Sequence, residues 1–299
     1  MTGRHGGQGP SADRKAQGHG NQTLREAVAS GRDTLSGHSV SPRLDAELLL
    51  CEALGVPRAH LYAHPDVTLD PEPARRYRGL IARRARGESV AVLRGCREFW
   101  SLDLVIRPGV LVSRAETELL VETALERLGA DPAQVVDLGT GSGAIALALA
   151  SERPGWSLTA TDRSPAALDL ARHNAQHLGI PGIQWVLGEW LHPFREAAFD
   201  LIVSNPPYIA PGDPELEAAV LDHEPRSALL CADHGLEAIH AIVTGAPRIL
   251  RPGGYLMVEH GHRQGPQVRA LFEQAGLQRV ETLRDLGDRE RMSLGTRRT

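Results

Sequence analysis

The spacing of apolar residues separates a helical first part of the chain from a mixed second part. In residues 23–87, apolar positions recur every three or four residues, which predicts amphipathic helices. Ser41 followed by Pro42 is typical of a helix start, and Gly55 of a helix end. We therefore expect residues 23–87 to form a small helical domain.

The segments on either side of this helical part have a different composition. Residues 1–22 are rich in glycine and polar side chains and have almost nothing to bury, so we expect a disordered tail. Residues 88–112 carry β-branched and aromatic residues, among them Val90 and Val92, between turn residues. This pattern favours a β-hairpin linker.

Residues 113–299 alternate between strand-like and helical runs. One helical run, residues 165–178, follows Ser164, which we expect to cap it. Such alternation predicts an α/β fold with a doubly wound, mostly parallel sheet. The expected strands are residues 135–138, 158–161, 183–187, 201–203 and 255–258, with a late pair near Val280 and Met292.

Composition narrows the class of protein. The chain has 299 residues, of which 41% are hydrophobic and 23% charged, as in globular proteins of two domains. No apolar run approaches the roughly 18 residues that span a bilayer, and no apolar leader follows the first basic residues, so we expect a cytoplasmic protein. Cys51, Cys96 and Cys231 are far apart, which argues against disulfides and C-x-x-C sites. The net charge of -4 does not favour a general attraction to nucleic acid.

A glycine-rich turn joins the first strand of the expected sheet to a helix. Glycine lets the backbone pass close to a ligand that a Cβ atom would exclude. Asp162 follows the next strand, about 20 residues later, where a carboxylate can accept from both ribose hydroxyls. With Ala144 the turn also fits the G-x-G-x-x-A form of nicotinamide or flavin sites, so the pattern indicates a nucleoside cofactor without identifying it. The candidate residues of the turn are Asp137, Gly139, Thr140, Gly141, Ser142 and Gly143.

The sequence Asn205, Pro206, Pro207, Tyr208 follows the fourth expected strand. Consecutive prolines fix φ and lack N–H groups, which leaves carbonyl oxygens free to accept. The Asn205 side-chain oxygen and the Pro206 carbonyl could hold a planar NH2 group, with Tyr208 stacked on its plane. An amide nitrogen is a poor nucleophile, so catalysis would come mainly from orientation, which can lower a barrier by roughly 7–11 kcal/mol.

Together, the DLGTGSG turn, Asp162 and NPPY resemble the signature of class I S-adenosylmethionine-dependent methyltransferases that act on amino groups of planar substrates. The resemblance implies a seven-stranded sheet and S-adenosyl-L-methionine as cofactor, and it disfavours a dehydrogenase. It also implies cofactor contacts at residues 139–143, at Asp162, at Asn205, and at Trp190 with Glu189 beside it.

The segment GCREFWSLDLVIRPGVLVSRAETELL, residues 95–120, resembles more narrowly the release factor glutamine methyltransferases (PrmC/HemK). This resemblance extends over nearly the whole chain and implies N5-methylation of the glutamine in the Gly-Gly-Gln motif of peptide chain release factors. It places substrate contacts at Arg114 and Thr117 beside the NPPY residues. The family has prolines where this chain has Ser113 and Ala115, so we expect a less rigid loop.

Other readings of the site stay open. NPPY also occurs in enzymes that methylate exocyclic amino groups of DNA or ribosomal RNA, and a related enzyme methylates a ribosomal protein glutamine. A base-flipping enzyme would need a basic face and further length after NPPY, so we expect no stable nucleic acid complex. From a different class, a cofactor-binding protein that only docks on the translation machinery would share the motifs.

Three further features of the sequence bear on its partners and ligands. The arginines at 75, 76, 78, 83, 84 and 86 form either a solvated helix face or a contact surface for the release factor. The histidines lack H-E-x-x-H spacing, so we expect no metal site. The tail contains Gly6, Gly7 and Gln8, most simply by chance in a glycine-rich segment. We expect a monomer without membrane contact.

Overall fold

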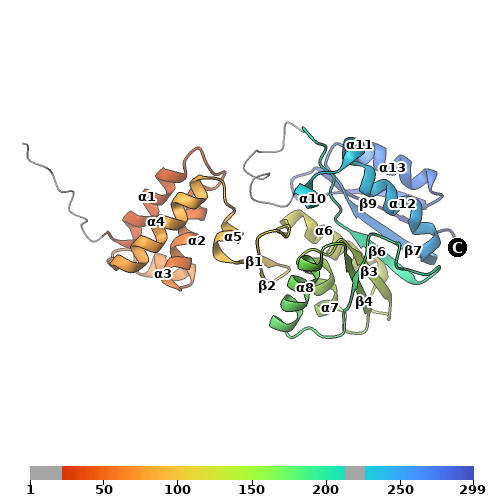
Figure 1. The fold of residues 1–299 in the computed structure, drawn as a ribbon, viewed down its shortest axis with the longest axis horizontal. Helices are drawn as coiled ribbons and strands as arrows, with labels where there is room; N and C mark the ends of the chain where they lie inside the picture. The colour runs from red at the N-terminus through yellow and green to blue at the C-terminus, as the bar shows by residue number, and fades with distance from the viewer. Residues whose placement is uncertain (1–21, 213–225) are drawn as a thin grey trace, which may run out of the picture. The chain divides into compact units, whose positions relative to one another are not determined.

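The computed structural model describes residues 22–212 and 226–299 (Figure 1). The predicted tail therefore lies, apart from Gln22, outside the described residues. The chain divides into two compact units, Met1–Ala82 and Arg83–Thr299. The finer division that we expected, with boundaries after residues 22, 87 and 112, stays a prediction.

The described part of the first unit is helical. Thr23 and Glu26 form a capping box at its start, with the Glu26 carboxylate accepting from the Thr23 backbone N–H at 2.9 Å. Gly55 ends the second helix with a φ of 68°, as its position predicted. The Tyr77 hydroxyl donates to the Ala27 carbonyl inside the core. The helices are α1 (Leu24–Leu35), α2 (Pro42–Leu54), α3 (Arg58–Ala63) and α4 (Pro71–Ala85).

The segment after α4 begins with a short helix rather than with the expected hairpin. Val90 and Val92, which we assigned to the hairpin, lie in α5 (Val90–Arg94). The helix forms because the Ser89 side chain accepts from the Val92 backbone N–H, and it ends at Gly95 with a φ of 69°. The assignment of these two valines to a strand was therefore wrong.

The hairpin itself pairs β1 (Cys96–Phe99) with β2 (Leu102–Val105) in antiparallel register. Trp100 and Ser101 form its turn, with φ values of 53° and 59° that favour tight hairpins but strain side chains other than glycine. The Trp100 backbone N–H donates to Glu118 at 2.9 Å, and its indole N–H donates to Glu152 at 2.8 Å. These contacts fix the turn against the helices behind it.

The second unit contains the seven-stranded sheet that the family resemblance implied, in the order β5-β4-β3-β6-β7-β9-β8. The first five of these strands pair in parallel, and β9 is antiparallel to both β7 and β8. All seven strands lie where the alternating pattern placed them. They are β3 (Gln134–Leu138), β4 (Ser157–Asp162), β5 (Gln184–Leu187), β6 (Phe199–Ser204), β7 (Leu250–Glu259), β8 (Gln278–Arg284) and β9 (Glu290–Thr296).

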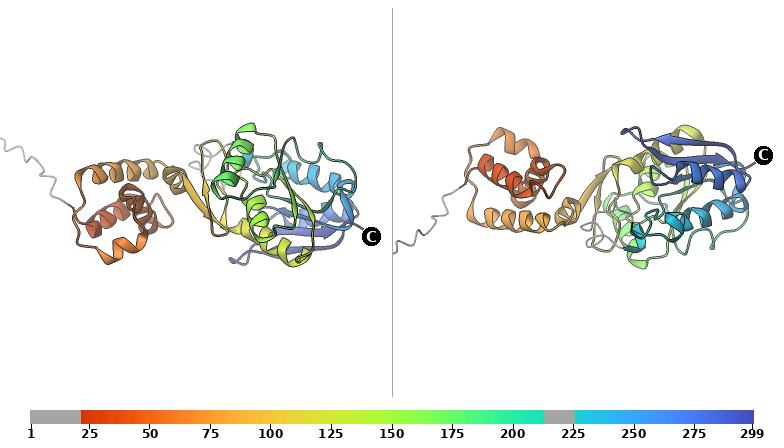
Figure 2. Two further views of the ribbon diagram at one scale, coloured as in Figure 1. Left: turned by 90° about the horizontal axis from the view of Figure 1, so that it is seen from below. Right: turned by 90° about the horizontal axis from the view of Figure 1, so that it is seen from above.

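Helices cover both faces of this sheet, as can be followed in Figure 2. Neighbouring residues of one strand enter different cores: Val135 packs in the cluster that includes α6 and α7, and Val136 in the cluster that includes α12 and α13. Ser164 caps α8 as expected, accepting from the Ala167 N–H. The helices after the hairpin are η1 (Ala115–Thr117), α6 (Glu118–Leu128), α7 (Ala144–Glu152), α8 (Pro165–His177), α10 (Arg226–Leu229), α11 (Ala232–Gly235), α12 (Glu237–Ile249) and α13 (Gly265–Gln274).

The strand order reverses at β3, which has β4 on one side and β6 on the other. Ligands of open α/β sheets bind at such a point, outside the carboxyl ends of the strands. The Ser204 hydroxyl donates to the Leu138 carbonyl at 2.8 Å and so joins the last residues of β6 and β3. The topology therefore brings the glycine turn and the NPPY segment together.

Within the two stretches that the structure describes, every helix is too short or too polar to cross a lipid bilayer.

Candidate functional site

A pocket opens at the carboxyl ends of β3, β4, β5 and β6. Its walls come from the loops that follow these strands and from the segment between the hairpin and α6. Ten of the residues predicted from the sequence line it: residues 139–142, Asp162, Glu189, Trp190, Asn205, Pro207 and Thr117.

Two residues of the predicted set lie behind the glycine turn. Asp137 is fully buried and accepts from the Thr140 hydroxyl at 2.6 Å. Burial raises the pKa of Asp137 to about 7, although the Thr140 hydrogen bond opposes this shift. Gly143 starts α7 with a φ of 87°, and a Cβ atom there would lie 3.1 Å from the Ala171 Cβ. Both residues shape the turn from outside the pocket lining.

The glycine turn is held against β4. The backbone N–H groups of Gly139 and Thr140 both donate to the Thr161 carbonyl, at 2.9 and 2.8 Å. Gly139 has a φ of 72°, and a Cβ atom on it would lie 3.4 Å from the Trp190 ring. The indole therefore packs over the glycine, and a larger residue would narrow the pocket between them.

Asp162 connects the turn to the edge of the pocket. Its two oxygens accept from the backbone N–H groups of Gly141 and Ser164, at 3.0 and 2.8 Å. An ionised carboxylate has about four acceptor positions, so both oxygens can accept further hydrogen bonds. The carboxylate is thus fixed in place and still able to bind ribose hydroxyls.

These walls fit the nucleoside part of S-adenosylmethionine. Val110, Ile145 and Ala167 give the pocket apolar surfaces beside the Trp190 ring, as a flat base requires. Asp162 supplies the acceptor for a ribose, and Gly139 lacks the Cβ atom that would fill the space next to the indole. At the rim, Glu189 pairs with Arg163 at 3.8 Å.

Asn205 stands at the edge of the pocket, directly after β6. Its side-chain amide donates to the Thr117 hydroxyl oxygen at 2.9 Å. Because the nitrogen is engaged by Thr117, the acceptor oxygen on the other side of the amide is turned away from Thr117 and remains available. Thr117, predicted as a substrate contact, thus also orients the predicted catalytic residue.

Three further residues of the predicted set lie outside the pocket lining: Arg114, Pro206 and Tyr208. The Tyr208 hydroxyl donates to Glu259 at 3.2 Å. Burial, together with the nearby negative charge of Glu259, raises the pKa of Tyr208 above its usual value, so the phenol stays protonated. The aromatic residue of NPPY is therefore held through its hydroxyl.

Glu259 is a residue whose role we did not predict. It ends β7, is 1% exposed, and burial raises its pKa to about 7 against the opposing effects of Thr117, Arg291 and Tyr208. In the sequence, its role was indicated only by one glutamate at the end of an apolar strand, in the EHG segment that matches the family. Only the fold brings it behind NPPY.

Asn174 is a second residue without a predicted role. It is fully buried in α8, and its amide donates to the carbonyls of Ser142 and Val105, at 2.9 and 3.1 Å. Its side-chain oxygen accepts from the Val105 N–H at 2.9 Å. Asn174 therefore ties the end of the hairpin to the glycine turn.

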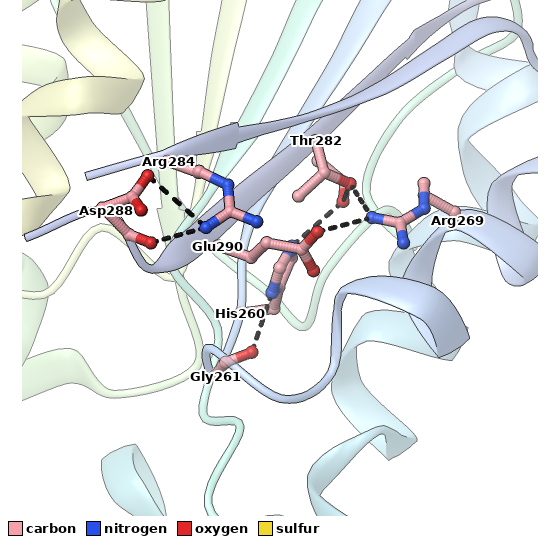
Figure 3. A network of polar contacts seen from close by, with 8 residues as sticks. His260, Gly261, Arg269, Thr282, Arg284, Asp288 and Glu290 are labelled. Atoms are coloured by element: carbon pink, nitrogen blue, oxygen red, sulfur yellow. Dashed lines mark hydrogen bonds and ion pairs between the residues drawn. The ribbon is translucent and has the colours of Figure 1, made fainter.

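His260, next to Glu259, anchors a chain of polar contacts (Figure 3). Its Nδ1 lies 2.9 Å from the Gly261 carbonyl, which can only accept, so Nδ1 carries the hydrogen and Nε2 accepts from the Ser293 hydroxyl at 3.0 Å. Ser293 then accepts from Thr282, which accepts from Arg269. Burial lowers the pKa of His260, which favours this neutral form and a structural role.

Comparison with known proteins agrees with this geometry. The PrmC N-terminal domain model matches residues 26–95, and the methyltransferase small domain model matches residues 104–222. A methyltransferase structure from Pyrococcus furiosus shares the fold, with a TM-score of 0.52, 18% identity, and coverage of 73% of this chain and 99% of that one.

Curated relatives are much closer in sequence. The release factor glutamine methyltransferase of Xylella fastidiosa strain Temecula1 is 49% identical over 85% of this chain and 92% of its own length. The Escherichia coli K12 enzyme of the same name is 46% identical over 91% of this chain and 96% of its own length. The chain therefore belongs to the release factor glutamine methyltransferase (PrmC/HemK) family of class I S-adenosylmethionine-dependent methyltransferases.

Proposed function

We propose that this enzyme methylates the side-chain amide nitrogen, N5, of the glutamine in the Gly-Gly-Gln motif of peptide chain release factors. The observation that carries the proposal is the Thr117–Asn205 hydrogen bond, which leaves the Asn205 acceptor oxygen available beside the nucleoside pocket. Family membership over most of the chain supports the same substrate.

The residues act mainly by orientation. S-adenosylmethionine, when bound, supplies an electrophilic methyl group on its sulfonium sulfur. Asn205 and the Pro206 carbonyl accept the two N–H hydrogens of the substrate amide and present its nitrogen in line with that methyl. Transfer of that methyl to the amide nitrogen would leave S-adenosyl-L-homocysteine, and the nitrogen would release one proton to water. Acceptor oxygens beside the nitrogen stabilise its developing positive charge.

We assign the remaining roles as follows. Asn205 and Pro206 are the catalytic residues, and Asn205 also borders the cofactor. Arg114, Thr117, Pro207 and Tyr208 shape the substrate side of the site. The cofactor side consists of Asp137, residues 139–143, Asp162, Glu189 and Trp190, of which Asp137 and Gly143 act from behind the turn.

The enzyme is proposed to work as a cytoplasmic monomer on its protein substrate. Its arginine-rich segment is a candidate contact surface for the release factor. Several of these arginines are already engaged, among them Arg76 with Glu52 at 2.8 Å and Arg83 with Glu88 at 2.5 Å. A contact with the release factor would therefore compete with internal ion pairs.

The test is transfer of labelled methyl from S-adenosylmethionine to a purified release factor. We expect one methyl group on the motif glutamine, and none on a release factor with that glutamine replaced by alanine, on ribosomal RNA or on DNA. Asn205→Ala should abolish transfer with cofactor binding largely retained, whereas Gln184→Ala, which truncates an exposed amide on β5, should leave transfer unchanged. Label on nucleic acid, or on the alanine variant of the release factor, would overturn the assignment.

A further inference from the structure

Glu259 lies behind the NPPY segment and takes no direct part in the proposed methyl transfer. It is 1% exposed at the end of β7, and its Oε1 accepts from the Tyr208 hydroxyl at 3.2 Å. A buried carboxyl group is costly unless charged or polar partners surround it, so its position requires an explanation.

Thr117 connects this carboxyl group to Asn205. The Thr117 oxygen accepts from the Asn205 amide at 2.9 Å, so its own hydrogen is left to donate elsewhere. The Thr117 hydroxyl lowers the pKa of the Glu259 carboxyl group, and the buried Glu259 Oε2 atom lacks a hydrogen-bond partner among the described residues. When Thr117 directs its hydrogen to this carboxylate, the polar contacts run in one direction, from Asn205 to Thr117 to Glu259.

The other groups that face Glu259 balance its charge only in part. Arg291 on β9 attracts the carboxylate, but Asp285 shares this guanidinium and accepts from both its Nε and an Nη atom at 3.1 Å. Glu116 in η1 repels the carboxylate. Tyr208 remains protonated and only donates.

We propose that Glu259 is a positioning residue whose ionised carboxylate orients Asn205 through Thr117 and holds Tyr208 directly. An ionised carboxylate can only accept, so both hydroxyls must point toward it. Thr117 then has to accept from Asn205, and the Asn205 oxygen is left for the substrate NH2 group. The inference rests on the proposed function, because the orientation matters only for a substrate with hydrogens to donate.

Protonation would remove this constraint. A neutral carboxylic acid also donates, so Thr117 could accept from Glu259 instead and leave the Asn205 amide free to rotate. Burial raises the pKa of Glu259 to about 7. The orienting form is therefore present above that value and lost as the pH falls through it.

The test compares Glu259→Gln with the wild-type enzyme on a purified release factor across pH 6–8.5. We expect the wild type to be about 100-fold faster in kcat at pH 8.5, since small misplacements of reacting groups cost about this much. The ratio should fall as the pH drops, because the wild-type carboxyl group then becomes neutral as well. Taking a ratio removes pH effects that both proteins share, such as titration of Asp137.

Cofactor binding and matched variants separate a positioning role of Glu259 from a general loss of structure. Cofactor affinity by calorimetry should change less than twofold, and Glu281→Gln on β8, a partly exposed glutamate, serves as the matched control. Thr117→Val should lose activity like Glu259→Gln without a change of charge, Thr117→Ser should restore it, and the two losses should not add. A pH-independent ratio, or a Glu259→Gln rate within twofold of wild type at pH 8.5, would overturn the role of Glu259. Absence of transfer by the wild-type enzyme would instead overturn the proposed function.

Discussion

The side-chain amide of Asn174 donates to the main-chain carbonyl of Ser142 at 2.9 Å and so fastens the glycine turn to helix α8. The same amide group exchanges two hydrogen bonds with the Val105 backbone at the end of the hairpin. One buried side chain thus fixes two segments that are far apart in the sequence, and one of them lines the cofactor pocket.

Replacing Asn174 with alanine should therefore weaken both the fold and the cofactor site. The change leaves the Val105 N–H and two carbonyls without partners, at a cost of about 1–3 kcal/mol in the free energy of unfolding. Denaturant unfolding measures this loss, and calorimetry should show weaker binding of S-adenosylmethionine. Asn174→Asp keeps the acceptor for Val105 but loses both donors, so equal cofactor affinity in wild type and Asn174→Asp would contradict a role at Ser142.

Gly31 in the first unit lies so close to the Tyr77 side chain that only glycine fits there. A Cβ atom there would lie 2.0 Å from the Tyr77 hydroxyl oxygen. Gly31→Ala should lower the free energy of unfolding by about 1–3 kcal/mol through overpacking. Gly79→Ala in α4, where a Cβ atom meets nothing within 4 Å, should instead stabilise by about 0.5–1 kcal/mol. Equal effects of the two changes in urea unfolding would refute the packing argument.

Comparing Gly139→Ala with Gly179→Ala separates the effect of backbone strain from the effect of pocket shape on cofactor binding. Gly139 and Gly179 have φ values of 72° and 65°, so alanine at either should cost about 1–2 kcal/mol of stability. A Cβ atom at 139 also meets the Trp190 ring, whereas one at 179 meets nothing within 4 Å. We expect only Gly139→Ala to lower cofactor affinity. Calorimetric titration of both variants checks this, and parallel losses of affinity would assign the effect to strain.

The buried Asp137 predicts a pH dependence of stability. Burial raises its folded-state pKa to about 7 from 3.8, so the folded protein binds a proton that the unfolded chain releases in this range. Its contribution to stability is therefore present below about pH 4 and is lost as the pH rises to about 7. Asp137→Asn should reduce the decline of the free energy of unfolding between these pH values, as measured by denaturant unfolding at several pH values. If the free energy of unfolding of Asp137→Asn changed with pH as steeply as that of the wild type, a group other than Asp137 would be responsible.

Local patterns predicted most of the fold, for physical reasons that individual elements illustrate. The sheet strands are buried apolar runs, and the turn at Gly55 needs a positive φ, so both follow from nearby residues. The prediction of a strand at Val90 and Val92 was wrong because it rested on the preference of β-branched residues for strands. The Ser89 cap and the helix end at Gly95 instead favour a helix there. Glu259 and Asn174 could not be assigned, because their partners come from distant parts of the chain.

Because Trp190 packs over Gly139, its intrinsic fluorescence comes from the wall of the pocket. An indole ring that borders the nucleoside pocket changes its surroundings when that pocket fills, so its emission can report occupancy without any added label. Cofactor binding can then be followed by tryptophan fluorescence and methyl transfer by the isotope label, in the same sample.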